Sequence, residues 1–261
     1  MDLLSSGVLF LMGILAGMIN AAVGSGSLLT LPVLLALGVP PGTAVRTNTI
    51  GMTFASIGSA VGFRTEVAKE LPYLGPLVTT TVLASAAGSL LLLVSPSSTL
   101  DVVIPVLIVV ALVLVLGQPR LSRWLAAKHA TEASGIVGPA YRKPPLVVAM
   151  SAAAVYGGYF TAAQGILYMA IMGVGTNRSY KDVNPVKVFL AMFVNLTATL
   201  VYLIAHFCFD ADVRWAATAI IAVGGLIGGY AGAFVAKRLP AGVFRVLIVV
   251  VALVALVKQL L

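Results

Sequence analysis

The chain has 261 residues, of which 60% are hydrophobic and 9% are charged, and its mean hydropathy is +1.09. An ordinary soluble domain carries about 25% charged residues, so this composition excludes a soluble globular enzyme, a disordered chain and a disulfide scaffold. The formal net charge of +8 does not indicate nucleic-acid binding, because the charges stand in short gaps between apolar runs, as they do in membrane proteins. The single cysteine, Cys208, excludes an internal disulfide and a cysteine cluster for a metal.

Ten apolar runs divide the chain, and a spanning helix needs about 20 apolar residues. The runs are 3–19, 26–37, 44–63, 72–94, 100–117, 144–160, 164–176, 184–206, 213–236 and 241–260. The pairs 3–19/26–37 and 144–160/164–176 are short and interrupted. The first run follows Asp2 and lacks the positive flank of a signal peptide, so we expect it to belong to the fold. The pattern predicts an all-α polytopic membrane protein with about 8–10 membrane helices.

The two interrupted pairs begin two halves of the chain that resemble each other. Residues 17–24 align with 158–165, and an asparagine follows in each half, at Asn48 and Asn184. Each half has about five segments, and an odd number makes the halves inverted relative to each other. We predict an N-terminal membrane repeat over 1–117, a connecting loop over 118–143 and an inverted C-terminal membrane repeat over 144–261.

Positive residues predict the orientation, because cytoplasmic loops carry an excess of lysine and arginine. The longest hydrophilic loop, 118–143, is expected to be cytoplasmic because it carries Arg120, Arg123, Lys128, Arg142 and Lys143. Alternation then puts 64–71, 177–187 and the Lys237-Arg238 turn inside, and 39–46, 95–99, 207–212 and both termini outside. Arg46 and Lys258 are the two positive charges that fit this scheme poorly.

The interruptions are the candidate binding site. The first contains Gly24-Ser25-Gly26-Ser27, preceded by Asn20. Broken backbone at membrane depth is tolerated where it lines a cavity or packs in protein, and a helix that restarts after Gly26 directs free N–H groups toward an anion. The second contains Thr161, Gln164 and Gly165. Close helix packing at the first break, and a packing kink at the second, are the alternatives.

Two cations and two asparagines follow the breaks. Ionisable residues inside membrane segments are rare and usually functional. Arg46 and Lys187 stand in corresponding regions of the halves, so we expect them to converge on a central anion, with snorkelling to the headgroups as the alternative. Thr47-Asn48 and Asn184 open their segments and are expected to orient the anion, to cap a helix, or to do both.

Other polar and small residues receive plainer interpretations. Asn195, in the middle of an apolar run, is expected to bond a neighbouring helix or line the path. Glu66, Glu70 and Asp182 are interpreted as solvated loop charges, with a proton relay by one of them as the alternative. Gly224, Gly228 and Gly232, with Gly225 and Gly229, form small-xxx-small rows that predict tight helix packing.

The opening of the chain resembles the TauE/SafE sulfite-exporter family, also called the TSUP group of anion permeases. The resemblance rests on Gly13, Gly17-Met18-Ile19, Gly24-Ser25-Gly26-Ser27, Pro32, Gly38-Val39-Pro40-Pro41, Ala44 and Thr47-Asn48. The second half departs from the pattern, with Gln164-Gly165-Ile166-Leu167 in place of a glycine-rich stretch. The resemblance implies a carrier for sulfur-containing anions, such as sulfite or sulfonates like sulfoacetate, in a bacterial inner membrane.

We therefore predict a secondary transporter of a sulfur-containing anion, working by alternating access. An anion channel and a transporter of a non-sulfur organic anion are the alternatives. The expected substrate-binding residues are Asn20, Gly24, Ser25, Gly26, Ser27, Arg46, Thr47, Asn48, Gln164, Gly165, Asn184 and Lys187. No cofactor, metal or nucleic acid is expected, the coupling ion (a proton or another ion) and a homodimer are left open, and membrane lipid is the expected surrounding.

Overall fold

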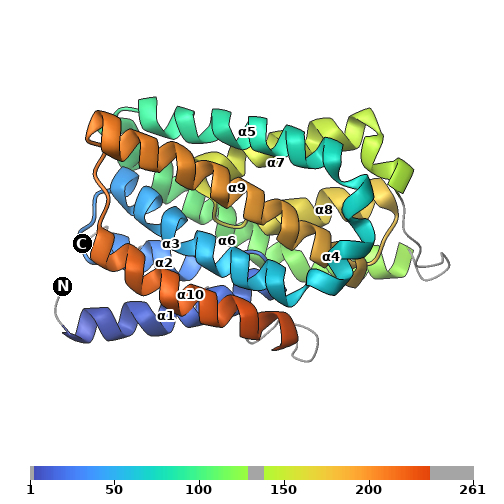
Figure 1. The fold of residues 1–261 in the computed structure, drawn as a ribbon, viewed down its shortest axis with the longest axis horizontal. Helices are drawn as coiled ribbons and strands as arrows, with labels where there is room; N and C mark the ends of the chain where they lie inside the picture. Colours follow the sequence, from blue (N-terminus) through green and yellow to red (C-terminus); the bar gives the residue numbers. More distant parts are fainter. Residues whose placement is uncertain (1–2, 129–137, 236–261) are drawn as a thin grey trace.

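The computed structural model describes residues 3–128 and 138–235, and every element in that part of the chain is helical (Figure 1). The elements are α1 (Leu3–Ala22), α2 (Ser27–Ala36), α3 (Pro41–Gly62), α4 (Arg64–Glu70), η1 (Leu71–Tyr73), α5 (Gly75–Val94), α6 (Ser97–Lys128), η2 (Gly138–Arg142), α7 (Pro144–Phe160), α8 (Gln164–Thr176), α9 (Tyr180–Phe209) and α10 (Trp215–Val235). Helices α1, α5, α6, α9 and α10 are long and apolar enough to cross a membrane. The prediction of an all-α polytopic membrane protein is confirmed.

The apolar runs from 3–19 to 213–236 each coincide with one helix. The run 241–260, the Lys237-Arg238 turn and Lys258 lie outside the described residues. The connecting segment differs from expectation, because α6 does not end near residue 117 but continues to Lys128, with Pro119 inside it. The short helices α4 and η2 were not predicted, since their stretches are too short and too polar to give an apolar run, and η1 overlaps the start of the run 72–94.

The interrupted pairs form two helical hairpins that enter from opposite ends of the molecule (Figure 1). Helix α2 has 10 residues and α8 has 13, which at 1.5 Å per residue gives about 15 and 20 Å, too short for a bilayer core of about 30 Å. Near the end of α8, a Cβ placed on Gly175 would lie 2.7 Å from Leu146, near the start of α7. Each short helix therefore returns to the end from which its partner came.

The two halves run in opposite directions. Helices α3 and α9 are antiparallel, because Thr53 bonds Thr199 whereas Ser56, further along α3, bonds Asn195, earlier in α9. Gly24 and Gly165, which the sequence alignment makes equivalent, touch each other. Equivalent residues that touch lie on the symmetry axis, so the contact marks a pseudo-two-fold axis through the middle of the molecule.

One helix of each half packs against helices of the other half. Helix α10 packs against α1 and α3, and α5 packs against α7 and α9. Glycines make these approaches close: a Cβ on Gly228 would lie 1.9 Å from the Ile14 carbonyl oxygen, and one on Gly229 would lie 2.1 Å from that of Ala55. The small-xxx-small rows on α10 thus form the predicted tight packing. Gly88 of α5 allows the same close approach, because a Cβ on it would lie 2.0 Å from the Val155 carbonyl oxygen of α7.

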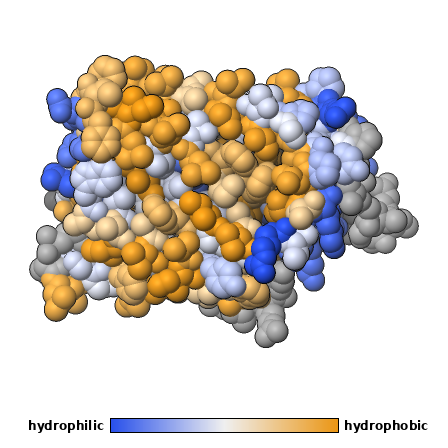
Figure 2. Space-filling model, viewed as in Figure 1, coloured by the Kyte–Doolittle hydropathy of each residue, from blue (hydrophilic) through white to orange (hydrophobic). Residues whose placement is uncertain are grey.

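Three connections join at one end of the molecule. Arg178 forms an ion pair with Glu70 at 2.7 Å, and both side chains are at most 10% exposed. The Tyr141 hydroxyl donates to Glu70 at 2.9 Å and accepts from Arg178 at 2.7 Å; burial raises its pKa, which keeps the proton in place for that donation. The interpretation of Glu70 as a solvated loop charge is wrong, because α4, η2 and the α8–α9 connection cover it. Figure 2 shows the wide apolar face between this polar end and the opposite one.

Candidate functional site

The tips of the two hairpins meet at the centre of the fold. We call residues 23–27 the first tip and residues 161–165 the second tip. The Gly165 amide donates to the Gly24 carbonyl oxygen at 3.1 Å. A Cβ on Gly24 would lie 2.6 Å from the Gly165 Cα, and one on Gly165 would lie 2.5 Å from the Gly24 Cα. Only glycine fits at either position, so the two breaks predicted from the sequence form one locus.

The first tip is built from backbone. Gly24 has a φ of 81°, a left-handed conformation that favours glycine. Gly26 stands before α2, where a Cβ would lie 2.0 Å from the Ala16 carbonyl oxygen, and no side chain caps the helix there. Ser27 begins α2 and is buried, and the buried Ser25 hydroxyl has no hydrogen-bond partner in the described part of the chain. The N-terminal end of α2 thus faces the centre, with its partial positive charge.

The second tip is built from side chains. Thr161 and Ala163 both have a φ of 60°. The Thr161 hydroxyl bonds the Thr49 hydroxyl of α3 at 3.3 Å. Gln164 begins α8 fully inside the protein, and neither its amide oxygen nor its amide nitrogen has a partner among the described residues. Both tips therefore present the N-terminal end of a short helix, to which the first tip adds a hydroxyl and the second an uncommitted amide.

Lys187 reaches this centre from α9. Its side chain is 1% exposed, its Nζ donates to the Asn20 carbonyl oxygen at 3.1 Å, and it lies 3.3 Å from where a Cβ on Gly24 would be. Asn184, one turn earlier on the same face, donates to the Ala21 carbonyl oxygen at 3.2 Å, and its Oδ1 has no partner among the described residues. Burial at the tips rules out snorkelling to the headgroups for Lys187.

Asn48 and Thr47 take the corresponding place on α3. The Asn48 Oδ1 accepts from the Thr30 hydroxyl of α2 at 2.5 Å, and its Nδ2 has no partner in the described chain. The Thr47 hydroxyl accepts from the Arg214 amide at 3.0 Å. Neither Asn48 nor Asn184 caps a helix, because α3 begins at Pro41 and α9 at Tyr180, so the capping interpretation is wrong for both.

Arg46 lies apart from these residues. Its Nε donates to the Asp212 carbonyl oxygen at 3.0 Å and its Nη2 to the Thr43 hydroxyl at 3.2 Å. Asp212 belongs to the α9–α10 connection, at the end of the molecule opposite the Glu70–Arg178 pair (Figure 1). The expected convergence of Arg46 and Lys187 on one point does not occur in this structure.

A polar seam between α3 and α9 extends the site, and the sequence analysis missed most of it. The Asn195 Nδ2 and the Asn20 Nδ2 both donate to the Ser56 hydroxyl, at 2.6 and 3.2 Å. The Thr53 and Thr199 hydroxyls bond each other at 2.7 Å. Asn195 bonds a neighbouring helix as expected. The missed signal was the spacing of hydroxyls at 49, 53 and 56, which falls on one face of a helix.

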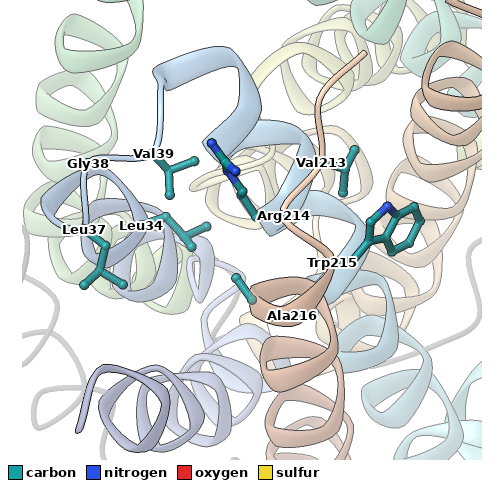
Figure 3. Close-up of a pocket in the computed structure, with 9 residues that line it drawn as sticks. Leu34, Leu37, Gly38, Val39, Val213, Arg214, Trp215 and Ala216 are labelled. Carbon is teal, nitrogen blue, oxygen red and sulfur yellow. The ribbon is translucent and has the colours of Figure 1, made fainter. Parts of the chain in front are cut away.

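A pocket of about 430 Å³ opens at the end near Arg46 (Figure 3). Figure 3 shows Leu34 and Val39 of the first half opposite Val213 and Arg214 of the second. The Arg214 backbone bonds Thr47, the residue before Asn48, and Leu34 is one turn along α2 from Thr30, the partner of Asn48. The pocket thus lies next to the polar centre on the side of the first hairpin.

Comparison with known proteins gives the family. The model of the sulfite exporter TauE/SafE family matches residues 9–258. The chain is 26% identical to the probable membrane transporter protein YfcA of Escherichia coli (strain K12) over 256 residues, covering 97% of this chain and 89% of that one. It is 23% identical to the probable membrane transporter protein ORF9 of Sinorhizobium sp, covering 97% and 91%. No solved structure matches the chain. The chain therefore belongs to the TauE/SafE family of integral membrane proteins, and it is a membrane permease.

Proposed function

We propose that this TauE/SafE permease is a secondary transporter of a sulfur-containing anion, sulfite or an organosulfonate, in a bacterial inner membrane. The observation that carries the proposal is the meeting of the two hairpin tips around a buried lysine. Lys187 supplies positive charge at the centre, and the N-terminal end of α2 supplies more. The family and the membrane transporter relatives support the permease part of the proposal.

The uncommitted polar atoms favour an oxyanion as the ligand. Buried polar groups in proteins are almost always hydrogen-bonded, and leaving one without a partner costs about 1–3 kcal/mol. The Ser25 hydroxyl, the Asn48 Nδ2 and the Gln164 Nε2 are three such donors, from both tips and α3. The three oxygens of a sulfite or sulfonate group accept from several convergent donors, as a phosphate does at a helix N-terminus. We propose that Asn20, Gly24, Gly26, Ser27, Thr47, Asn184 and Gly165 shape this site.

We propose that the protein works by alternating access, and the hairpins that enter from opposite ends support this proposal. The pocket next to Thr47 is open at one end, while the Glu70–Tyr141–Arg178 cluster ties three connections together at the other. We propose that one hairpin moves against the other, together with the helix that the other half packs against it. This movement opens the end held by the Glu70–Tyr141–Arg178 cluster and closes the pocket. We propose for Arg46, which bonds the 210–214 connection, a role in holding the pocket end in shape rather than direct anion contact.

The orientation is testable with the native cysteine. Cys208, the one cysteine of the chain, is exposed near the end of α9, on the side proposed to face out of the cytoplasm. A membrane-impermeant maleimide should label it in intact spheroplasts. In a Cys208→Ser background, Lys69→Cys on α4 should be labelled only after lysis, because 64–71 and the 118–143 connection are proposed to be cytoplasmic. The reverse labelling pattern would overturn this orientation.

Ligand-induced stabilisation of the purified protein tests the substrate. Sulfite, methanesulfonate, sulfoacetate, sulfate, lactate and chloride would be compared, and a ligand at 100 times its Kd raises the free energy of unfolding by about 2.7 kcal/mol. We expect a selective response to sulfite or a sulfonate, lost in Lys187→Met and kept in Arg46→Met, its matched control. A response to lactate alone would point to a non-sulfur organic anion. Flux in proteoliposomes without saturation or counterflow would point to a channel.

A further inference from the structure

The ammonium group of Lys187 has no counter-ion in the part of the protein that is described. The ion pairs there join Arg178 to Glu70 and Arg214 to Asp212. Helices α1 and α8, which enclose Lys187 with the tips, contain no charged residue, and the residues after 235 contain no acidic side chain. The one printed hydrogen bond of Nζ goes to a neutral backbone carbonyl.

Charged and titratable groups on the other elements that pack against α9 are engaged elsewhere. On α4, Glu70 pairs with Arg178 and Glu66 accepts from Thr65, while Arg64 and Lys69 are exposed. On α9 itself, Asp182 accepts from Ser179. Arg46 of α3 bonds Asp212, and Tyr156 of α7 donates to the Ala162 carbonyl oxygen of the second tip. Asp101, Arg120 and Arg123 of α6 lie on exposed or partly exposed parts of that helix.

An unpaired charge in such a place is costly. The penalty for burying an ion without a partner is several kcal/mol, and it is relieved when the group is neutral or when an opposite charge binds beside it. A neutral amine in the empty site and an ammonium in the anion-filled site are therefore the two low-energy states. Anion binding and protonation then favour each other, as linked binding events must.

We propose that Lys187 couples transport to protons: the Nζ amine takes up one proton when a monoanion binds, and anion and proton leave together on the other side. This proposal rests on the proposed function and deepens it. Written out, a neutral amine, one proton and one monoanion become an ammonium–anion pair, and release restores the neutral amine. The cycle moves no net charge. A dianion such as sulfate leaves a surplus negative charge in the site, so the carrier should favour monoanions.

Methanesulfonate is the appropriate probe, because it remains a monoanion over the whole working pH range and carries no proton of its own. Protein in liposomes with an internal pH dye would be given a methanesulfonate gradient, with the membrane voltage clamped by potassium and valinomycin. We expect one proton to move with each anion and the flux to be independent of voltage. Methanesulfonate flux without protons, or flux driven by voltage, overturns the coupling while leaving the proposed transport intact. Absence of flux for methanesulfonate, sulfite and sulfoacetate alike overturns both.

Substitutions at Lys187 and Arg46 give a second test of the proton coupling. Lys187→Arg keeps a charge that does not titrate, so we expect anion exchange across the membrane to persist while net uptake driven by a pH gradient falls at least tenfold. Lys187→Met should lose both. Arg46→Met, a cation outside the tips, should keep a one-to-one ratio of protons to anions. Pumping by Lys187→Arg that still follows the pH gradient would overturn the proposal, and the wild-type proton count decides it where a variant does not fold.

Discussion

Both hairpin tips turn the chain at the centre of the fold, but they present different chemical groups there. The first tip turns through a glycine at a φ of 81°, whereas the second turns through Thr161 and Ala163, both at a φ of 60°. A residue with a Cβ in this left-handed conformation costs about 1–2 kcal/mol relative to the right-handed one. The second tip therefore tolerates strain that the first avoids, and it gains the Thr161 hydroxyl and a position for Gln164.

This difference separates two ways of presenting donors at membrane depth. Backbone donors at the first tip need glycine, because the second tip contacts the main chain there directly. Side-chain donors need a residue with a Cβ, and the turn must accept the strain. A symmetrical fold thus holds an asymmetrical site, with a serine hydroxyl beside the N-terminal end of α2 on one side of the ligand and an amide beside the N-terminal end of α8 on the other.

The largest effect is expected from adding one methyl group between the tips. Gly24→Ala meets both the strain of a positive φ and the backbone of Gly165, so we expect a loss of about 3–5 kcal/mol or failure to fold. Gly38→Ala is the matched control, because Gly38 has a φ of 77° but open space around it. Thermal unfolding in detergent measures both. Equal losses would mean that the contact of the tips adds nothing.

The next effect concerns Gln164. Gln164→Leu removes two buried polar atoms without partners, so we expect the empty protein to gain about 1–3 kcal/mol. The anion-induced shift in melting temperature should disappear in the same variant. A Gln164→Leu protein that is more stable and still responds to the anion would remove Gln164 from the site.

A smaller gain is expected from relieving the second tip. Ala163→Gly removes the Cβ that strains the left-handed conformation, and the greater freedom of glycine in the unfolded chain offsets part of the gain. We expect a net stabilisation of about 0.5–1 kcal/mol with anion binding unchanged. Destabilisation in the thermal unfolding curve would contradict the account of strain at this tip.

A gain of similar size is expected from Ser25→Ala. The one hydroxyl has no partner in the described chain, so its removal should raise the free energy of unfolding by about 1 kcal/mol, the lower end of the cost of an unpartnered buried group. The apparent Kd for the anion should rise by about tenfold, the equivalent of one hydrogen bond to a charged group. Titration of the melting temperature with the ligand separates the two effects. A large loss of stability with unchanged affinity would make Ser25 a packing residue.

Much of the architecture could be predicted from the sequence, because membrane helices appear in a sequence as apolar runs. The interruptions marked the hairpins, and the small residues marked the close helix contacts. Capping was a wrong alternative for Asn48 and Asn184 because the polar helix beginnings before them escaped the apolar pattern: Pro41 suits a first turn, and the Ser179 hydroxyl caps α9.

The positions of Arg46 and Lys187 could not be predicted from the sequence, because the two residues do not align with each other between the halves. With Asn48 aligned to Asn184, the equivalent of Lys187 is Gly51 and the equivalent of Arg46 is Asp182. Arg46 and Lys187 occupy corresponding regions but different turns of helix, and they reach different places. The burial of Glu70 was missed for another reason. It depends on three connections far apart in the chain, and nothing local indicates that they meet.

The packing of α10 against α1 and α3 has a consequence for how the protein is made. Helix α3 ends at Gly62 and its partner α10 begins at Trp215, so at 5–20 residues per second the ribosome needs roughly 8–30 seconds to reach it. During that time the grooves of α1 and α3 face lipid without the helix whose glycines fit them. We therefore expect the N-terminal half to complete its packing only after α10 has been made.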